Sequence, residues 1–352
     1  MFADLTAHWL DAALRSAGEL DVTVIDLQVE PLGAEVGFLG DLARVTPTYG
    51  SGADLTRAPA SFVVKLPPTD AGAHRIGSML RAWSREVAFY AQVAPLSSEI
   101  QVPRCFYGGA DEANERWVLV LDDLAVGMAS IDLDAGATRK QAEAAIDALA
   151  VFHARWWQAN ERFDWMPGFD TTGVGGLQSP WLDAHPHFLD RYGHLCPEPS
   201  SDWLTTFAPR LTEWSTKAAR EPITIVHGDY RLDNVIFVDA QVMMIDWQTA
   251  LRGPAAMDVS SFIASSLSTD NRSAWESQLI SRYLDGVGRA GIEVDAVWFN
   301  DSYDENLLWW MGQFANNLAH LKPDEPHRQR ALDTMVVRIF TAALDRNVGR
   351  LL

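Results

Sequence analysis

The chain has 352 residues, of which 48% are hydrophobic and 21% are charged. These values are typical of a globular protein with a sizeable core and exclude a disordered chain. Because one compact domain rarely grows beyond about 250–300 residues, we expect two lobes or two domains. The net charge of −19 and the pI of about 4.8 argue against nucleic acid and anionic membranes as partners, because binding to either depends on basic surface.

The cysteines and residues 1–20 indicate the cellular compartment in which the protein is expected. Cys105 and Cys196 stand alone, without the spacing of a metal or redox site. A chain of this length without a disulfide framework fits a reducing environment, so we expect a cytoplasmic protein. Residues 1–20 carry acidic side chains among their apolar positions, which predicts an amphipathic helix rather than a signal peptide. No apolar run approaches the roughly 18 residues that a membrane span needs.

The first third of the chain is expected to be rich in strands. Apolar and β-branched runs predict strands at 21–31, 61–66 and 117–121. Residues 79–93 have the spacing of a helix, and its expected buried face consists of Leu80, Trp83, Val87 and Tyr90.

After Leu124 the pattern becomes helical. The expected helices are 138–158, 260–267, 273–290, 305–321 and 329–348. Residues 177–199 are rich in Pro, His and Gly, which predicts irregular structure with short helices. A strand-rich part followed by a helix-rich part predicts two lobes, at 1–122 and 123–352.

The strongest motif is V-H-G-D-Y-R-L-D-N-V-I-F at 226–237, followed by V-M-M-I-D-W-Q at 242–248. The short apolar runs 223–226 and 242–245 predict two strands of one hairpin that flank a polar loop. An Asp, an Asn five positions later and a second Asp could supply a carboxylate for a hydroxyl acceptor and hard oxygen ligands for magnesium. The alternative is that Asp229 and Asp233 are ordinary turn residues.

This combination resembles the aminoglycoside phosphotransferase and choline kinase-like family, including its ecdysteroid-kinase-like relatives. The resemblance implies an α+β, protein-kinase-like fold with two lobes, a small strand-rich N-lobe and a larger helical C-lobe. It implies that Asp229 positions the acceptor hydroxyl and accepts its proton, and that Asn234 and Asp246 hold Mg²⁺. His227 would support the loop.

The resemblance also implies a nucleotide-binding N-lobe, with the nucleotide held in a cleft. Lys65 matches the lysine that contacts the α- and β-phosphates, and Glu86 matches its ion-pair partner. The alternative for Lys65 is a surface lysine at a strand edge. The segment 120–124 resembles the hinge whose backbone binds adenine, which assigns Asp123 and Leu124 to the cofactor site.

A glycine-spaced segment at 32–40 departs from the usual phosphate-binding pattern. Gly33 and Gly37 could let backbone N–H groups approach phosphate, or they could form an ordinary hairpin turn. Asp258 begins an expected helix, either as its N-cap or as a brace for the catalytic loop. His153 is interpreted as a core histidine whose hydrogen bonds are satisfied.

The acceptor site is expected in the second lobe, because 11 of the 14 tryptophans follow Leu124. Trp310, Phe314 and Asn317 share one face of an expected helix. Such a stripe is either part of the core or one wall of an acceptor pocket. An aromatic wall in an acidic protein would suit a cationic or ring-containing alcohol.

These observations predict an ATP- and Mg²⁺-dependent phosphotransferase that acts on a hydroxyl of a small molecule, such as an amino alcohol, a sugar, an antibiotic or a steroid-like alcohol. The alternative is a nucleotide-binding pseudokinase that acts as a regulatory module, but Lys65, Asp229, Asn234 and Asp246 are all present. A protein acceptor is disfavoured, because G-P-A-A-M-D follows I-D-W-Q almost at once and leaves no long activation segment.

Overall fold

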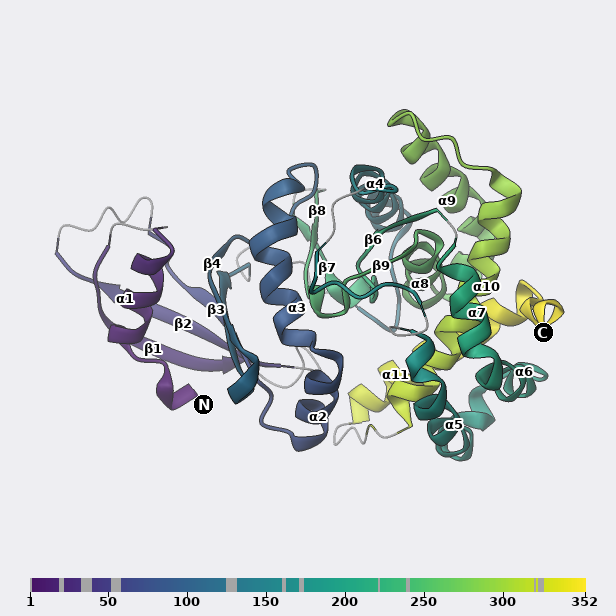
Figure 1. Cartoon of the computed structure of the whole chain (residues 1–352), viewed down its shortest axis with the longest axis horizontal. Coiled ribbons are helices and arrows are strands. Elements are labelled where there is room, and N and C mark those ends of the chain that lie inside the picture. The colour runs from purple at the N-terminus through teal and green to yellow at the C-terminus, as the bar shows by residue number, and fades with distance from the viewer. Residues whose placement is uncertain are drawn as a thin grey trace. The chain divides into compact units, whose positions relative to one another are not determined.

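A computed structural model gives the fold of the chain (Figure 1). The structure describes residues 2–18, 22–32, 40–51, 58–124, 132–159, 163–170, 174–220, 222–238, 241–319, 321 and 326–352. The chain divides into two compact units, Met1–Met128 with Ile245–Thr249, and Ala129–Met244 with Ala250–Leu352. The short segment Ile245–Thr249 therefore packs with the first unit although both of its neighbours in sequence belong to the second.

The first unit contains a five-stranded antiparallel sheet with the order β1-β2-β3-β5-β4. Its strands are β1 (Val24–Leu32), β2 (Asp41–Tyr49), β3 (Phe62–Leu66), β4 (Cys105–Asp111) and β5 (Arg116–Asp122). The expected strands at 21–31, 61–66 and 117–121 are confirmed as β1, β3 and β5. The other two strands were not expected, because Pro47 interrupts β2 and the pair Gly108 and Gly109 weakens β4.

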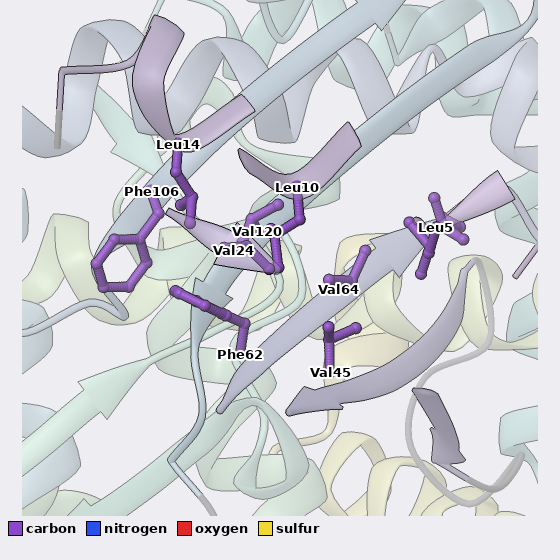
Figure 2. Close-up of a cluster of buried hydrophobic side chains, with 10 residues drawn as sticks. Leu5, Leu10, Leu14, Val24, Val45, Phe62, Val64, Phe106 and Val120 are labelled. Atoms are coloured by element: carbon purple, nitrogen blue, oxygen red, sulfur yellow. The ribbon is translucent and has the colours of Figure 1, made fainter. Parts of the chain in front are cut away.

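Helix α1 (Ala7–Ser16) covers part of this sheet and confirms the amphipathic N-terminal helix. Figure 2 shows its Leu10 and Leu14 among side chains from the strands, which together form a buried apolar cluster. The rings of Phe62 and Phe106 meet edge to face in this cluster, with centroids 5.0 Å apart. The core of the first unit therefore lies beneath α1 and supports β3, the strand that carries Lys65.

The helix expected at 79–93 is divided into separate segments. Helix α2 (Ala71–Leu80) ends at Arg81, whose φ of 51° is left-handed, and α3 (Ala82–Ala88) follows at once. A π-helical turn, η2 (Phe89–Val93), continues α3. Leu80 therefore belongs to the preceding helix, whereas Trp83 and Tyr90 are buried as expected.

Two short two-stranded antiparallel sheets lie in the second unit. Strand β6 (Ile223–Val226) pairs with β9 (Leu251–Pro254), and β7 (Val235–Val238) pairs with β8 (Gln241–Met244). The two strands expected around the polar loop exist as β6 and β8, but the prediction that they form one hairpin is wrong. Each pairs with a strand of its own, because β9 and β7 were not recognised as strands.

The rest of the described second unit is helical. Its helices are α4 (Arg139–Arg155), α5 (Gln178–Tyr192), α6 (Ser200–Phe207), α7 (Leu211–Ala218), α8 (Ala256–Ser266), α9 (Thr269–Arg289), α10 (Ala296–Leu318) and α11 (Pro326–Asp345). Single helical turns occur in both units. Those of the first unit are η1 (Phe2–Asp4), η3 (Ala94–Leu96), η4 (Glu112–Asn114) and η9 (Trp247–Thr249), and those of the second are η5 (Gly175–Leu177), η6 (Gly193–Leu195), η7 (Ala208–Arg210), η8 (Leu232–Asn234) and η10 (Val348–Leu351). Every residue of α8 is buried, and α8 contacts α4, α9, α10 and α11, so it forms the centre of this unit. None of the described helices is both long enough and apolar enough to cross a membrane.

The expectation of irregular structure at 177–199 is wrong for most of that segment. Helix α5 runs for 15 residues and contains Pro186. The proline removes one backbone hydrogen bond, to the carbonyl of Leu182, whose residue is 44% exposed and open to water. Trp181, Phe188 and Tyr192 form a buried stripe at helical spacing, and burial of this stripe outweighs the proline.

Candidate active site

Lys65 lies in the first unit between two carboxylates. Its Nζ is 2.8 Å from Glu86 Oε2 and 2.9 Å from Asp246 Oδ1. Burial alone would lower the pKa of Lys65, but the Asp246 and Glu86 carboxylates outweigh it and raise that pKa. Burial also raises the pKa of Glu86, although Lys65 opposes this. The predicted pair Lys65–Glu86 is present, and Asp246 joins it.

Asp246 stands where β8 ends, in a strained backbone conformation. Its φ is 64°, a left-handed value that Asp tolerates better than most residues. Trp247 stacks on Phe89 of η2, with ring centroids 3.8 Å apart and planes 8° from parallel. Because η2 continues the helix that carries Glu86, this stacking fixes Asp246 near Lys65. Strain of this kind is common at functional sites.

The predicted catalytic loop, within the motif at 226–237, follows β6 in the second unit. Gly228 has a φ of 79°, which a residue with a side chain adopts only with strain. Asn234 Nδ2 donates to the backbone oxygen of Asp229 at 2.8 Å and to its Oδ2 at 3.1 Å. In this orientation the amide nitrogen of Asn234 is used in hydrogen bonds to Asp229, so the amide oxygen of Asn234 is the atom that could bind a metal.

The donor chemistry of the two predicted metal ligands suits Mg²⁺. A carboxylate on Asp246 and an amide oxygen on Asn234 are hard oxygen ligands. No group of three or more His, Cys, Asp or Glu that could hold a metal occurs among the residues that the structure describes. Magnesium in phosphotransferases is usually held by one or two protein ligands together with phosphate oxygens, so a larger cluster is not expected.

Asp258 braces the loop from α8. Its carboxylate accepts the backbone N–H of His227 at 2.6 Å and that of Gly228 at 2.9 Å, and lies 3.3 Å from His153 Nε2. The N-cap of α8 is Ala255, so the N-cap interpretation of Asp258 is wrong and the brace is confirmed. His153 is fully buried and its Nδ1 is 2.9 Å from Tyr283 Oη, which confirms a core histidine with satisfied hydrogen bonds.

The structure describes the predicted hinge but not the two predicted glycines. The Asp123 carboxylate is held by Arg44 Nε at 2.6 Å and by Ser61 Oγ at 2.7 Å, so its side chain is committed to neighbouring residues of the first unit. Leu124 follows it and is half-buried. Their backbone groups remain the predicted adenine contacts. Gly33 and Gly37 lie outside the described residues.

The predicted acceptor stripe does not form a single wall. Trp310 is 2% exposed, and its indole N–H donates to the backbone oxygen of Met257 at 2.8 Å, which places it in the core. Asn317 is exposed and accepts a hydrogen bond from Gln313. Phe314 is buried and lies beside the catalytic loop, with its ring centre 5.8 Å from the Arg231 guanidinium carbon.

Sequence reasoning missed Arg231. This residue lies two positions after Asp229 and contacts its carboxylate. The signal was available in D-Y-R-L-D, where one arginine stands between two aspartates, but charge spacing in a loop does not reveal which carboxylate an arginine contacts.

Comparison with known proteins agrees with these features. A model of the phosphotransferase enzyme family matches residues 53–294, more than half of the chain. An uncharacterized kinase-like protein from Caenorhabditis elegans is 23% identical over 306 residues, which cover 80% of this chain and 79% of the relative. The family resemblance inferred from the sequence is therefore confirmed.

Solved structures share the fold at low sequence identity. The GDP complex of aminoglycoside 2′-phosphotransferase-IIIa has a TM-score of 0.53 and 14% identity, covering 98% of this chain and 99% of that chain. The gentamicin–APH(2″)-IIa complex has a TM-score of 0.51 and 13% identity, covering 97% and 96%. These similarities confirm the predicted fold class, a strand-rich N-terminal part followed by a helical C-terminal part.

Proposed function

This chain belongs to the phosphotransferase enzyme family, and from this premise we propose that it transfers the γ-phosphate of ATP to a hydroxyl group of a small molecule. The observation that carries the proposal is the ion-pair triad of the buried Lys65 and Glu86 with the half-buried Asp246, because it joins a strand lysine, a helix glutamate and the aspartate of I-D-W-Q.

The nucleotide roles follow from this triad. Lys65 contacts the α- and β-phosphates, and Glu86 holds the ammonium in place. Asp246 and the amide oxygen of Asn234 hold Mg²⁺, which when bound neutralises charge on the phosphates. The backbone at Asp123 and Leu124 contacts adenine. Gly33 and Gly37 belong to the proposal only as possible phosphate contacts.

The acceptor chemistry depends on Asp229. Its carboxylate orients the acceptor hydroxyl and accepts the proton as the new O–P bond forms and the bond to the leaving ADP breaks. The brace from Asp258 keeps the backbone before Asp229 in place. Because Trp310 belongs to the core, we retain only Phe314 from the predicted stripe as a candidate boundary of the acceptor site.

The test is a screen of alcohols, amino alcohols, sugars, antibiotics and sterol-like compounds for ATP consumption by the purified protein with Mg²⁺. The proposal expects at least one acceptor whose phosphorylation disappears with EDTA. Asp229→Asn, which keeps the size but removes the charge, should lower kcat about 10²–10⁴-fold while ATP still binds. ATP binding without turnover on any acceptor would instead favour the regulatory module, and near wild-type turnover of Asp229→Asn would remove Asp229 from the mechanism.

A further inference from the structure

Arg231 lies against both oxygens of the Asp229 carboxylate. Its Nη2 donates a hydrogen bond to Asp229 Oδ2 at 3.2 Å, and its Nε is 2.7 Å from Asp229 Oδ1, an ion-pair contact without hydrogen-bond geometry. Asn234 Nδ2 adds a second hydrogen bond to Oδ2. A planar guanidinium that contacts both oxygens of a carboxylate fixes its rotation as well as its position, which a single point charge does not do.

The guanidinium is itself held from three directions. Its Nη2 is 3.1 Å from Asp233 Oδ2, on the same loop. Its Nη1 donates to Met335 Sδ of α11 at 3.0 Å, and its plane lies near the ring of Phe314 from α10. The Arg231 side chain is 10% exposed. The position of the guanidinium is therefore set by contacts from two C-terminal helices as well as by the carboxylates of its own loop.

We propose that Arg231 is a positioning residue that holds Asp229 in the orientation needed to accept the acceptor's proton, and that α10 and α11 set this orientation through Phe314 and Met335. The inference rests on the proposed function. It differs from a nucleotide-binding role, because a residue that contacts phosphate would change ATP affinity, whereas a residue that orients Asp229 changes kcat.

The size of the effect follows from the geometry of proton transfer. A misplacement of about 1 Å can lower the rate on the order of 10²-fold. We therefore expect Arg231→Met to lower kcat about 10²-fold and to leave the Kd for ATP within about threefold of wild type. Arg231→Lys retains the charge but not the two-oxygen contact, so we expect an intermediate loss of about tenfold.

Arg338 provides a matched control. It lines the same small hollow behind the loop as Arg231, Asp233 and Met335, and it is 5% exposed. Among the described residues, its guanidinium donates hydrogen bonds only to backbone oxygens. These oxygens belong to Leu133, Asp134 and Ser265. Arg338→Met thus removes a buried guanidinium from the same region without touching Asp229.

The experiment compares Arg231→Met, Arg231→Lys and Arg338→Met for melting temperature, ATP affinity by calorimetry, and kcat with an acceptor from the screen, all well below the melting temperature. The inference expects a loss of kcat in both Arg231 variants that Arg338→Met does not share. A loss of kcat in the Arg231 variants no greater than that in Arg338→Met would overturn the inference. A loss of ATP affinity that parallels the loss of kcat would also overturn it. If Arg231→Met does not fold, Arg231→Lys supplies the same comparison.

A crystal structure of an Arg231 variant separates this inference from the proposed function. If the wild-type protein phosphorylates no acceptor, the proposed function fails, and the orientation of Asp229 in the variant decides the inference alone. A rotated Asp229 carboxylate in the variant supports the positioning role of Arg231. An Asp229 side chain with unchanged torsion angles and hydrogen bonds to Asn234 overturns it.

Discussion

The ammonium group of Lys65 contacts two carboxylates at once, and each member of this triad has its own predicted role. Lys65→Ala should weaken the binding of ATP much more than that of adenosine, because only ATP carries the phosphates that an ammonium would contact. Asp246→Ala should instead abolish the dependence of ATP affinity on Mg²⁺. Calorimetry with both ligands, with and without Mg²⁺, measures both effects.

Lys140→Ala is a suitable control for this series, because Lys140 is exposed. It should change neither ligand's affinity. Equal losses of ATP and adenosine binding in Lys65→Ala would show that the triad only stabilises the fold.

Of the two alternatives for Trp310, core or pocket wall, the structure supports the core. Its ring is buried, and its N–H bonds to the backbone of Met257 in α8. Trp310→Ala should therefore lower the free energy of unfolding by about 3–5 kcal/mol, as large aromatic deletions in a core do. Thermal melting measures this. A melting temperature close to wild type would return Trp310 to the list of acceptor-site candidates.

Helix α8 holds the predicted catalytic loop through the carboxylate of Asp258. Asp258→Asn keeps the shape but replaces one acceptor oxygen with an N–H₂ group that faces backbone N–H groups. We expect a loss of about 1–3 kcal/mol in unfolding free energy and a fall in kcat, with ATP affinity retained. Chemical denaturation and steady-state kinetics measure the two effects.

Ser261→Ala is the matched control on α8, because the buried Ser261 hydroxyl has no hydrogen-bond partner in the part of the chain that the structure describes. It should be close to neutral. Loss of stability without any loss of kcat in Asp258→Asn would limit the brace to a structural role.

The elements show which parts of the fold the sequence could predict. Short apolar runs that end at polar residues revealed β6 and β8, but their partners did not follow from the same signal. Strand β9 contains Arg252, Gly253 and Pro254, and such a composition does not suggest a strand. Pairing between distant strands is decided by the tertiary fold, which local patterns do not encode.

Strand β2 illustrates the same limit. Pro47 lowers the expectation of a strand, because it cannot donate to a neighbouring strand. In the structure β3 pairs only with Asp41–Val45, so Pro47 lies where β2 has a single neighbour. The strand tolerates proline for a reason that depends on the length of another strand.

The candidate site was predictable in its identities more than in its contacts. The motif spacing brought Lys65, Glu86 and Asp246 into the hypothesis, and the structure places them within ion-pair distance. The contact between Arg231 and Asp229 and the burial of Trp310 depend on α8, α10 and α11, which approach the loop only in the folded chain.

The response of the whole molecule to acid depends on more than its 47 acidic residues. His185 of α5 is 4% exposed, and burial lowers its pKa from 6.5 to about 4, although a hydrogen bond to the Gly312 carbonyl opposes this. The folded protein therefore keeps His185 neutral while the unfolded chain binds a proton below about pH 6.5. Stability must fall as the pH decreases from 6.5 towards 4, and this contribution levels off below 4.

The loss of unfolding free energy due to His185 is about 1.4 kcal/mol for each unit that separates its pKa in the unfolded chain from its pKa in the folded protein. This gives about 3 kcal/mol between pH 6.5 and pH 4. His185→Gln retains an N–H that can reach Gly312 but does not titrate. Its unfolding free energy should therefore fall less steeply than that of wild type between pH 7 and pH 4.5, by about 2–3 kcal/mol. His187→Gln is the matched exposed control on the same helix. Because the carboxylates are identical in all three proteins, their contribution cancels, and parallel curves for wild type and His185→Gln would contradict the assignment.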